Sequence, residues 1–214
     1  EKGGGMHVQN VNSECDDTIK IQNNKCKEGG GLYANNVIAM PANKENTLVI
    51  EGNKGSVNGG GILVEGSFHG EKLAIMKSEA VSGGGMYVAY SEKTFILQDV
   101  TIESNNASSF GAGLFVTDRS NLVKLKSVVL AKNKDTNGNI NGGALSGGGL
   151  YVTRAENVLM DTMKVEMNEA KNGIKSKTQI RFCAERFRMN MSARQARVTR
   201  RKGSASERNR KWQE

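Results

Sequence analysis

The candidates for a general acid and base in this sequence are one pair of aspartates and one histidine followed by glycine. Asp16 and Asp17 are adjacent, and His69 precedes Gly70. Two carboxylates and an imidazole could supply the general acid and base that hydrolyse a glycosidic bond, provided that all of them converge on that bond. The aspartates and the histidine lie 53 residues apart. We therefore interpret them as solvated loop residues and predict no catalytic residue.

The sequence also lacks the patterns of a metal or cofactor site. Its three cysteines, Cys15, Cys26 and Cys183, form no Cys-x-x-Cys pair, and no Asp-x-Asp pattern indicates a calcium loop. The runs of three glycines are not phosphate-binding loops, because no Lys-Ser or Lys-Thr follows them. We predict no metal site and no cofactor, and we interpret Cys26 as a small buried apolar residue.

A phrase of six residues, which recurs along the chain, would position any functional side chain. Gly-Gly-Gly-apolar-x-apolar, or a close variant, starts at residues 3, 29, 59, 83, 111 and 147, at intervals of 24 to 36 residues. A period of this size predicts a solenoid or another array of repeats. Each glycine would cost about 1 kcal/mol in a helix interior, which argues against helical repeats.

A second recurring phrase places apolar residues five and three positions before an Asn at a corner. Ile19 and Ile21 precede Asn24 in this way. The same pattern ends at Asn53, Ser78, Asn105, Asn133 and Asn168. Alternation of period two predicts a short strand with one buried face. Strands this short must stack in coils about 4.8 Å apart, which would align the Asn side chains into a hydrogen-bonded ladder.

Together the phrases predict an all-β fold, a right-handed parallel β-helix of about six coils over residues 1–173. Each coil would contain the two strands and a third apolar segment such as Val37–Met40 or Phe95–Leu97. The longest interval, before the last glycine phrase, predicts an insertion at Asp135–Ser146 that loops out of one coil. Because the first glycine phrase begins at the third residue, we expect the sequence to be a fragment of a longer solenoid.

One coil shows both phrases together. Ile102–Ala107 reads apolar-x-x-Asn-x-small, and Gly111–Leu114 follows as Gly-Ala-Gly-Leu. This pairing resembles the repeats of the chlamydial-type polymorphic outer membrane proteins, within the pectate-lyase-like superfamily of right-handed parallel β-helices. The resemblance covers about residues 1–173 and implies a secreted or surface-displayed stalk that can act as an adhesin. The use of Gly-Gly-Gly and of Ser78 in place of Asn departs from the usual phrase.

The glycine phrase also supplies the candidate binding surface. Alternate residues of a strand point to opposite faces, so the residue between its two apolar positions should point outward. In a solenoid these residues would stack into a mostly aromatic column of His7, Tyr33, Leu63, Tyr87, Phe115 and Tyr151. The simpler interpretation is cross-coil packing that stabilises the sheet. The functional interpretation is a flat strip that binds sugar rings or a partner surface through Tyr33, Tyr87, Phe115 and Tyr151.

Charge separates the repeats from the end of the chain. Residues 1–174 carry 17 Lys+Arg against 19 Asp+Glu, a net charge of −2, whereas residues 175–214 carry 13 against 3, a net charge of +10. We predict residues 174–214 to be a basic tail, either disordered or a short amphipathic helix with apolar residues at helical spacing over 180–191. Two other interpretations are a segment that contacts an anionic surface and a stretch that is not native coding sequence. We favour the latter, or disorder, over nucleic-acid binding.

These observations predict a non-enzymatic, secreted or surface-exposed repeat protein that serves adhesion or structural display; the extracellular location comes from the family resemblance alone. Its partners would be carbohydrate or a protein on a host or partner cell, with no nucleic acid, and membrane contact is left open for the basic tail only. The alternative is a fragment of a carbohydrate-active β-helix enzyme, of the polysaccharide lyase or glycoside hydrolase type. An enzyme predicts converging carboxylates in a groove, whereas an adhesin predicts a uniform face with repeated aromatic residues.

Overall fold

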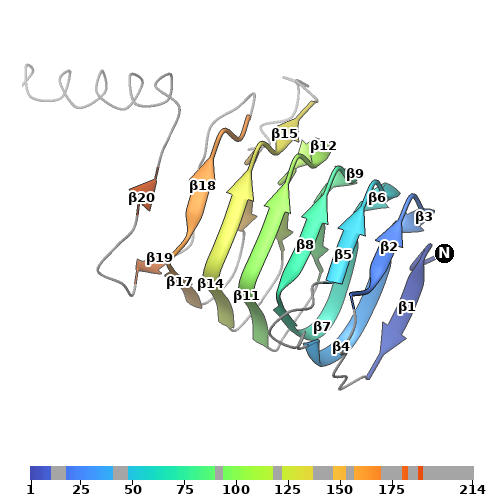
Figure 1. Cartoon of the computed structure of the whole chain (residues 1–214), viewed down its shortest axis with the longest axis horizontal. Helices are drawn as coiled ribbons and strands as arrows, with labels where there is room; N and C mark the ends of the chain where they lie inside the picture. The colour runs from blue at the N-terminus through green and yellow to red at the C-terminus, as the bar shows by residue number, and fades with distance from the viewer. Residues whose placement is uncertain are drawn as a thin grey trace, which may run out of the picture.

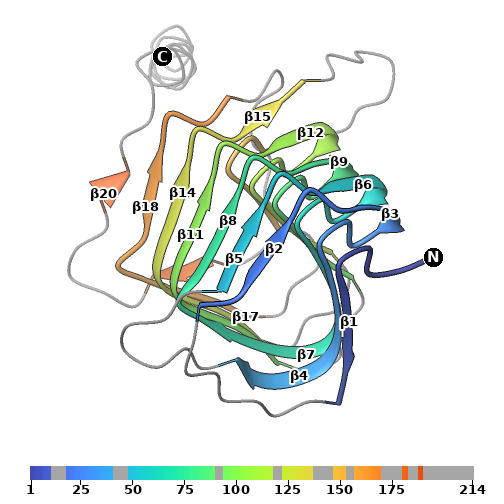
Figure 2. The same ribbon diagram turned by 45° about the vertical axis from the view of Figure 1, so that its right-hand side comes forward.

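The fold is a single stack of parallel strands, seen in a computed structural model of the chain (Figure 1). The residues that it describes are 1–10, 18–40, 48–89, 94–117, 122–136, 147–152, 157–169, 180–182 and 188–189. Every element in these ranges is a β-strand, so none of them contains a helix that could span a membrane. Seen from its N-terminal end, the chain turns clockwise as it recedes, so the predicted right-handed parallel β-helix is confirmed (Figure 2).

The glycine phrases form one ladder of strands. Its members are β1 (Met6–Gln9), β4 (Leu32–Met40), β7 (Ile62–Glu71), β10 (Met86–Val88), β13 (Leu114–Val116) and β16 (Leu150–Val152). Each pairs in parallel with the next, with the phrases in register. Four coils, between Gly29 and Asp135, contribute a strand to this ladder and to each of the three sets of strands described below. The complete part of the solenoid is thus slightly shorter than the predicted six coils, with β1 and β16 in the outer coils.

The Asn phrases form a second ladder. Its strands are β2 (Lys20–Gln22), β5 (Leu48–Glu51), β8 (Leu73–Met76), the later parts of β11 (Thr94–Glu103) and β14 (Leu122–Ala131), and β18 (Lys164–Glu166). The predicted third segment is also a strand in five of these coils; in the first coil it lies outside the described residues. It comprises the later parts of β4 and β7, the first parts of β11 and β14, and β17 (Asn157–Asp161).

A separate sheet follows the Asn corner. It contains β3 (Lys25–Glu28), β6 (Lys54–Asn58), β9 (Glu79–Ser82), β12 (Asn106–Phe110) and β15 (Lys134–Asp135). The small residues predicted after the corner point into the solenoid, and Gly55, Ala80 and Ala107 are buried there. Cys26 is only half-buried, contrary to the prediction, because its strand pairs with one neighbouring strand instead of two.

The inward side chains of the ladders meet in one apolar core. Ile50, Ile75 and Ile102 occupy the same position of successive Asn phrases and are fully buried, as the alternating pattern predicts. Phe68 and Phe95 stack on the third segment with their ring centroids 6.0 Å apart. Full burial of side chains of this size stabilises the fold by about 1.5–3 kcal/mol each. The core therefore provides a continuous support for whatever the outer faces present.

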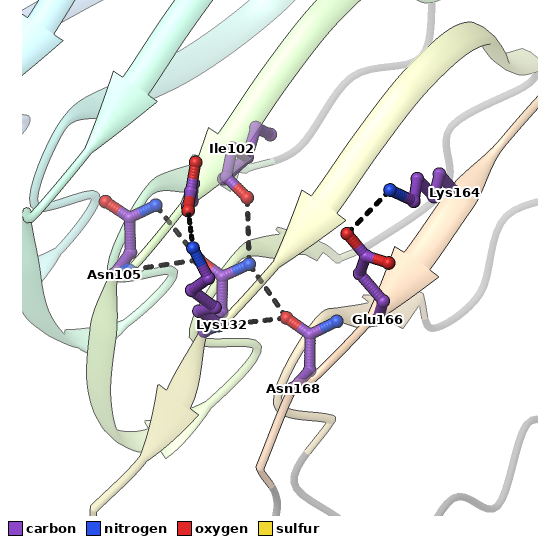
Figure 3. Close-up of polar contacts among 8 residues, drawn as sticks. Ile102, Asn105, Lys132, Lys164, Glu166 and Asn168 are labelled. Atoms are coloured by element: carbon purple, nitrogen blue, oxygen red, sulfur yellow. Dashed lines mark hydrogen bonds and ion pairs between the residues drawn. The ribbon is translucent and has the colours of Figure 1, made fainter. Parts of the chain in front are cut away.

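The predicted ladder of Asn side chains is confirmed (Figure 3). Asn105 donates to Asn133 Oδ1 through its amide Nδ2 and its backbone N–H, at 3.0 Å each. Asn133 donates to Asn168 Oδ1 in the same way, at 2.9 Å each. Its Nδ2 also donates to the backbone oxygen of Ile102 in the preceding coil, at 2.9 Å. Each buried amide is thus tied to the coils on both sides, which fixes the register of the stack.

The third glycine of a phrase lies close to the Asn side chain of the ladder and to the backbone of the next coil. A Cβ at Gly85 would lie 2.7 Å from the carbonyl oxygen of Gly113 and 2.9 Å from Asn105 Nδ2. The first glycine of a phrase is needed because its backbone is left-handed, as at Gly59, where φ is +63°. The recurrence of Gly-Gly-Gly therefore has a structural cause, namely the close approach of neighbouring coils.

Two short strands lie beyond the predicted domain boundary at residue 173. β19 (Ile180–Phe182) pairs with β17, and β20 (Arg188–Met189) pairs with β18. These five residues continue the parallel stack, so the amphipathic helix predicted over 180–191 is wrong where it covers them. The rest of the predicted tail lies outside the described residues, and so do Cys15, Cys183 and positions 137–146 of the predicted insertion.

Candidate binding surface

The middle residues of the glycine phrases form the predicted column. Parallel pairing places His7 beside Tyr33, Tyr33 beside Leu63, and Leu63 beside Tyr87. Phe115 and Tyr151 continue the column in the next two coils. The flanking apolar residues of the phrases face the core, so the column occupies the opposite, outer face of the ladder.

The column is more buried than an exposed strip would be. Tyr33, Leu63 and Phe115 are only 4%, 2% and 8% exposed, whereas Tyr87 and Tyr151 are half-buried. The rings cover one another edge to face. The Tyr87 and Phe115 centroids are 5.0 Å apart at an interplanar angle of 87°, and those of Phe115 and Tyr151 are 4.9 Å apart at 72°. Cross-coil packing is thus confirmed, and the predicted flatness of the strip is wrong because successive rings are nearly perpendicular.

Charged side chains cover the N-terminal half of the column. Lys2 Nζ donates to Glu65 Oε1 at 2.6 Å and lies 4.8 Å from the centroid of the Tyr33 ring. The Tyr33 hydroxyl donates to Glu65 Oε2 at 2.6 Å, and Asn35 Nδ2 donates to that hydroxyl at 3.4 Å. We call the ion pair of Lys2 and Glu65 the clamp. It joins the first coil to the third and places charge over the Tyr33 ring.

The clamp shifts the pKa values of its members. Burial by itself would raise the pKa of Glu65, but the hydrogen bonds from Lys2 and Tyr33 and the charge of Lys2 outweigh burial and lower it. Burial and the hydrogen bond to Glu65 raise the pKa of the Tyr33 hydroxyl. Burial opposes the charge of Lys2, yet the contacts with Glu65 raise the pKa of the ammonium group. The clamp is therefore ionised at neutral pH, with Tyr33 as a neutral donor.

An aromatic cluster forms the C-terminal half of the column. Phe110, at the end of β12, lies 5.7 Å from both Phe115 and Tyr151, measured between ring centroids. Tyr87 completes the cluster through its contact with Phe115. Tyr87, Phe110 and Tyr151 keep part of their surface exposed. The rings of this cluster contact one another, whereas the N-terminal half of the column carries the clamp over Tyr33.

Phe110 is a site residue that the sequence pattern did not single out. It stands directly before the fifth glycine phrase, and Lys2 stands directly before the first. Both side chains cover the column, one with an aromatic ring and one with a charge. The signal was therefore present in the residue that precedes each glycine phrase, a position that varies from copy to copy.

Paired charges line the outer face of the Asn ladder. Lys77 Nζ lies 2.7 Å from Glu51 Oε1, and Lys132 Nζ lies 2.6 Å from Glu103 Oε1, each across one coil step. Lys164 and Glu166 pair within β18 at 2.8 Å (Figure 3). The hydrogen bond and the charge of Lys77 lower the pKa of Glu51. Exposed pairs of this kind contribute little to stability, and here they form a solvated face.

The candidate acid and base residues are not brought together by the part of the chain that is described. His69 lies half-buried on β7, paired in register with Ile96. Asp16 and Asp17 lie outside the described ranges. Within those ranges no three side chains of His, Cys, Asp or Glu are placed to hold a metal ion.

Comparison with known proteins gives the chain no relative. No protein-family model, no curated protein and no solved structure matches it. The resemblance to polymorphic outer membrane protein repeats therefore rests on the two recurring phrases alone and stays a prediction. What the structure does establish is the class of architecture, a parallel β-solenoid.

Proposed function

We propose that the chain is a non-enzymatic repeat protein that serves adhesion or structural display, either secreted or at a cell surface. The observation that carries the proposal is the regular register of the outer faces. In the ladders of the glycine and Asn phrases, each coil presents its outward residues at the same position as the coil before it, on a continuous buried core. Repetition along one axis suits contact with an extended partner, whereas catalysis needs several different groups at one point.

The motif resemblance gives a second, weaker support. The polymorphic outer membrane proteins that it suggests are secreted or displayed at the cell surface, where a stalk-like solenoid acts as an adhesin. Half-buried aromatic residues that keep part of their surface exposed, such as Tyr151, are the kind of surface feature that marks interaction sites. The carbohydrate-active enzyme considered above has no particular observation in its favour, so we do not propose it.

A binding and turnover assay tests this function. The full chain, carrying a fluorescent label, is incubated with intact cells and extracellular matrix, and with a panel of polysaccharides whose cleavage products are measured. We expect saturable binding to cells or matrix and no cleavage. A Phe95→Asp variant, whose charge is placed in the core, serves as an unfolded control for non-specific adsorption. Cleavage of any polysaccharide by the intact chain, absent from this control, would contradict the proposal.

A further inference from the structure

We propose that the outer face of the Asn ladder, over its four central strands, binds a second copy of this chain in an antiparallel dimer. The strands are β5, β8 and the later parts of β11 and β14, which lie side by side (Figure 1). We call their outer side the ion-pair face. It belongs to a different ladder from the aromatic column, and the inference does not depend on the adhesive function proposed above.

The ion-pair face carries two ion pairs that point the same way along the solenoid axis. Glu51, on β5, pairs with Lys77 of the next coil at 2.7 Å. Glu103, on β11, pairs with Lys132 of the next coil at 2.6 Å. The strand register places these four residues in four successive coils. From β5 to β14 the charges are therefore negative, positive, negative and positive.

This order of charges is complementary to itself when the axis is reversed. A two-fold axis parallel to the strands, midway between β8 and β11, brings β5 opposite β14 of the second copy and β8 opposite its β11. Glu51 then faces Lys132 of the second copy, and Lys77 faces its Glu103. A copy with its axis parallel and in register would place like charges together, which is repulsive. Use of the same surface by both copies is the usual arrangement in homodimers.

The charged groups of the ion-pair face are accessible. The side chains of Lys77 and Lys132 are 67% and 53% exposed, and those of Glu51 and Glu103 are 27% and 33% exposed. The structure describes residues 48–89, 94–117 and 122–136 without a break, so β8, β11, β14 and the corners that follow them all belong to the described part of the chain. Each lysine can therefore reach a second carboxylate.

The outward side chains beside the charges are uncharged and let the two faces approach. They are half-buried, alternate with core residues along their strands and are in register, namely Val49, Ala74, Thr101 and Val129. Under the same two-fold axis Val49 faces Val129 of the second copy, and Ala74 faces its Thr101. The contact consequently leaves no buried charge without a partner.

The outer coils limit the contact to these four strands. The position equivalent to Val49 is Lys20 in one outer coil and Lys164 in the other. The two lysines would lie opposite each other, and Glu166 offsets the charge of Lys164 through an ion pair of 2.8 Å. Four strands span about 19 Å along the axis. Because this contact is smaller than the interface of a permanent dimer, we expect a dissociation constant of about 0.1 mM.

Sedimentation velocity of the full chain over a range of concentrations tests the dimer. We expect a monomer–dimer equilibrium that high salt weakens by about tenfold. Lys77→Glu/Lys132→Glu makes the four charges all negative, and Glu51→Lys/Glu103→Lys makes them all positive. Each variant alone should lose self-association at least tenfold, and an equimolar mixture of the two should restore the dimer.

Lys54→Glu/Lys134→Glu is the matched control. It makes the same change at two exposed, ion-paired lysines of the sheet that follows the Asn corner, and it should dimerise like the unaltered chain. A chain that stays monomeric at ten times the expected dissociation constant would overturn the proposal. Equal loss of self-association in this control and in Lys77→Glu/Lys132→Glu would also overturn it.

Cysteine cross-linking, which leaves the charges unchanged, tests the orientation. In a chain whose Cys15, Cys26 and Cys183 are changed to Ser, Val49→Cys/Val129→Cys should give a disulfide-linked dimer on mild oxidation. Within one chain the two positions lie three coil steps apart, or about 14 Å, which is too far for a disulfide. Val49→Cys alone is the control and should stay unlinked. Linking of this single variant, or no linking of the double variant, would overturn the antiparallel dimer.

Discussion

Ser78 interrupts the ladder of Asn side chains at the centre of the solenoid. It is fully buried, and its Oγ donates to the backbone oxygen of Met76 at 3.2 Å, within its own coil. In the neighbouring coils the Asn Nδ2 reaches the coil before, as Asn105 Nδ2 does to Ile75 O at 3.1 Å. For residue 78 the equivalent acceptor is the backbone oxygen of Ile50, and a serine side chain is too short to reach it. This gap in the ladder is a property of a single side chain.

We expect Ser78→Asn to stabilise the protein. The new amide would donate to Ile50 O and to the Oδ1 of Asn105, and each hydrogen bond gained should raise the free energy of unfolding by about 1 kcal/mol. In the neighbouring coil the Asn105 amide lies beside Gly85, whereas beside Gly61 the nearest atoms are the Gly85 carbonyl oxygen and the Ile75 and Ile50 methyl groups, and the new amide would have to fit there. Denaturant unfolding measures the change.

The reverse substitution, Asn133→Ser, is the control for the ladder. It would leave the partners of a buried amide without their hydrogen bonds and should lower the free energy of unfolding by about 1–3 kcal/mol. If Ser78→Asn were instead destabilising, the space beside Gly61 would be too small for an amide, and the gap would be a steric requirement.

Gly85→Ala should be strongly destabilising. The added methyl group would meet the Gly113 carbonyl oxygen at 2.7 Å and the Ile102 side chain at 2.7 Å, neither of which can move without shifting a coil. Overpacking of this kind costs about 1–3 kcal/mol. Ala112→Gly is the control, since the second position of that phrase already holds a buried Ala, and we expect a loss of only about 0.5–1 kcal/mol. Thermal unfolding of both variants decides whether the third glycine is needed for close packing.

At the scale of the elements, the strands and their register could be predicted from the sequence, because both follow from local periodicity. Apolar residues five and three positions before the corner, Leu48 and Ile50, defined the buried face of β5, and the recurrence of Asn defined the corner. Burial of the aromatic column could not be predicted in the same way. Whether Tyr33 is open or covered depends on Lys2 and Glu65, which are 63 residues apart and approach only in the stack.

The clamp predicts an acid-sensitive contact between Lys2, in the first coil, and Glu65 on β7. The folded state lowers the pKa of Glu65, so the clamp contributes stability above the ordinary Glu pKa of about 4.3. This contribution should fall as the pH drops through the lower folded value, because the protonated carboxyl no longer pairs with Lys2. Glu65→Gln should therefore lower the unfolding temperature at neutral pH, and the difference from the unaltered chain should vanish in acid.

Glu79→Gln supplies the comparison for the clamp. Glu79 pairs with Lys54 at 3.1 Å, but both side chains are more than half exposed. Exposed pairs are screened and contribute little, so this variant should unfold like the unaltered chain at every pH. An equal effect of the two substitutions would show that the position of Glu65 over the column has no special role.

At the scale of the whole molecule, charge and composition predicted a domain boundary near residue 174, but parallel strand pairing continues beyond it. The loss of glycine and Asn and the excess of Arg after that point predicted a separate tail. β19 and β20 nevertheless add parallel strands to β17 and β18. Parallel pairing uses backbone groups, which every residue supplies, so two short strands can join the stack without the repeat motif. Motif-based boundaries consequently underestimate the extent of the solenoid.

Removal of residues 175–214 should destabilise the last coil more than the rest. β17 and β18 would each lose a paired neighbour and become an open edge, while β5 and β8 in the interior keep both of theirs. Since each coil of a solenoid is stabilised mainly by its nearest neighbours, the effect should decay along the axis. Hydrogen exchange should show faster exchange of the β17 and β18 amides in the shortened chain and unchanged exchange in β5 and β8. Equal protection of β17 and β18 in both chains would mean that β19 and β20 contribute nothing to the stack.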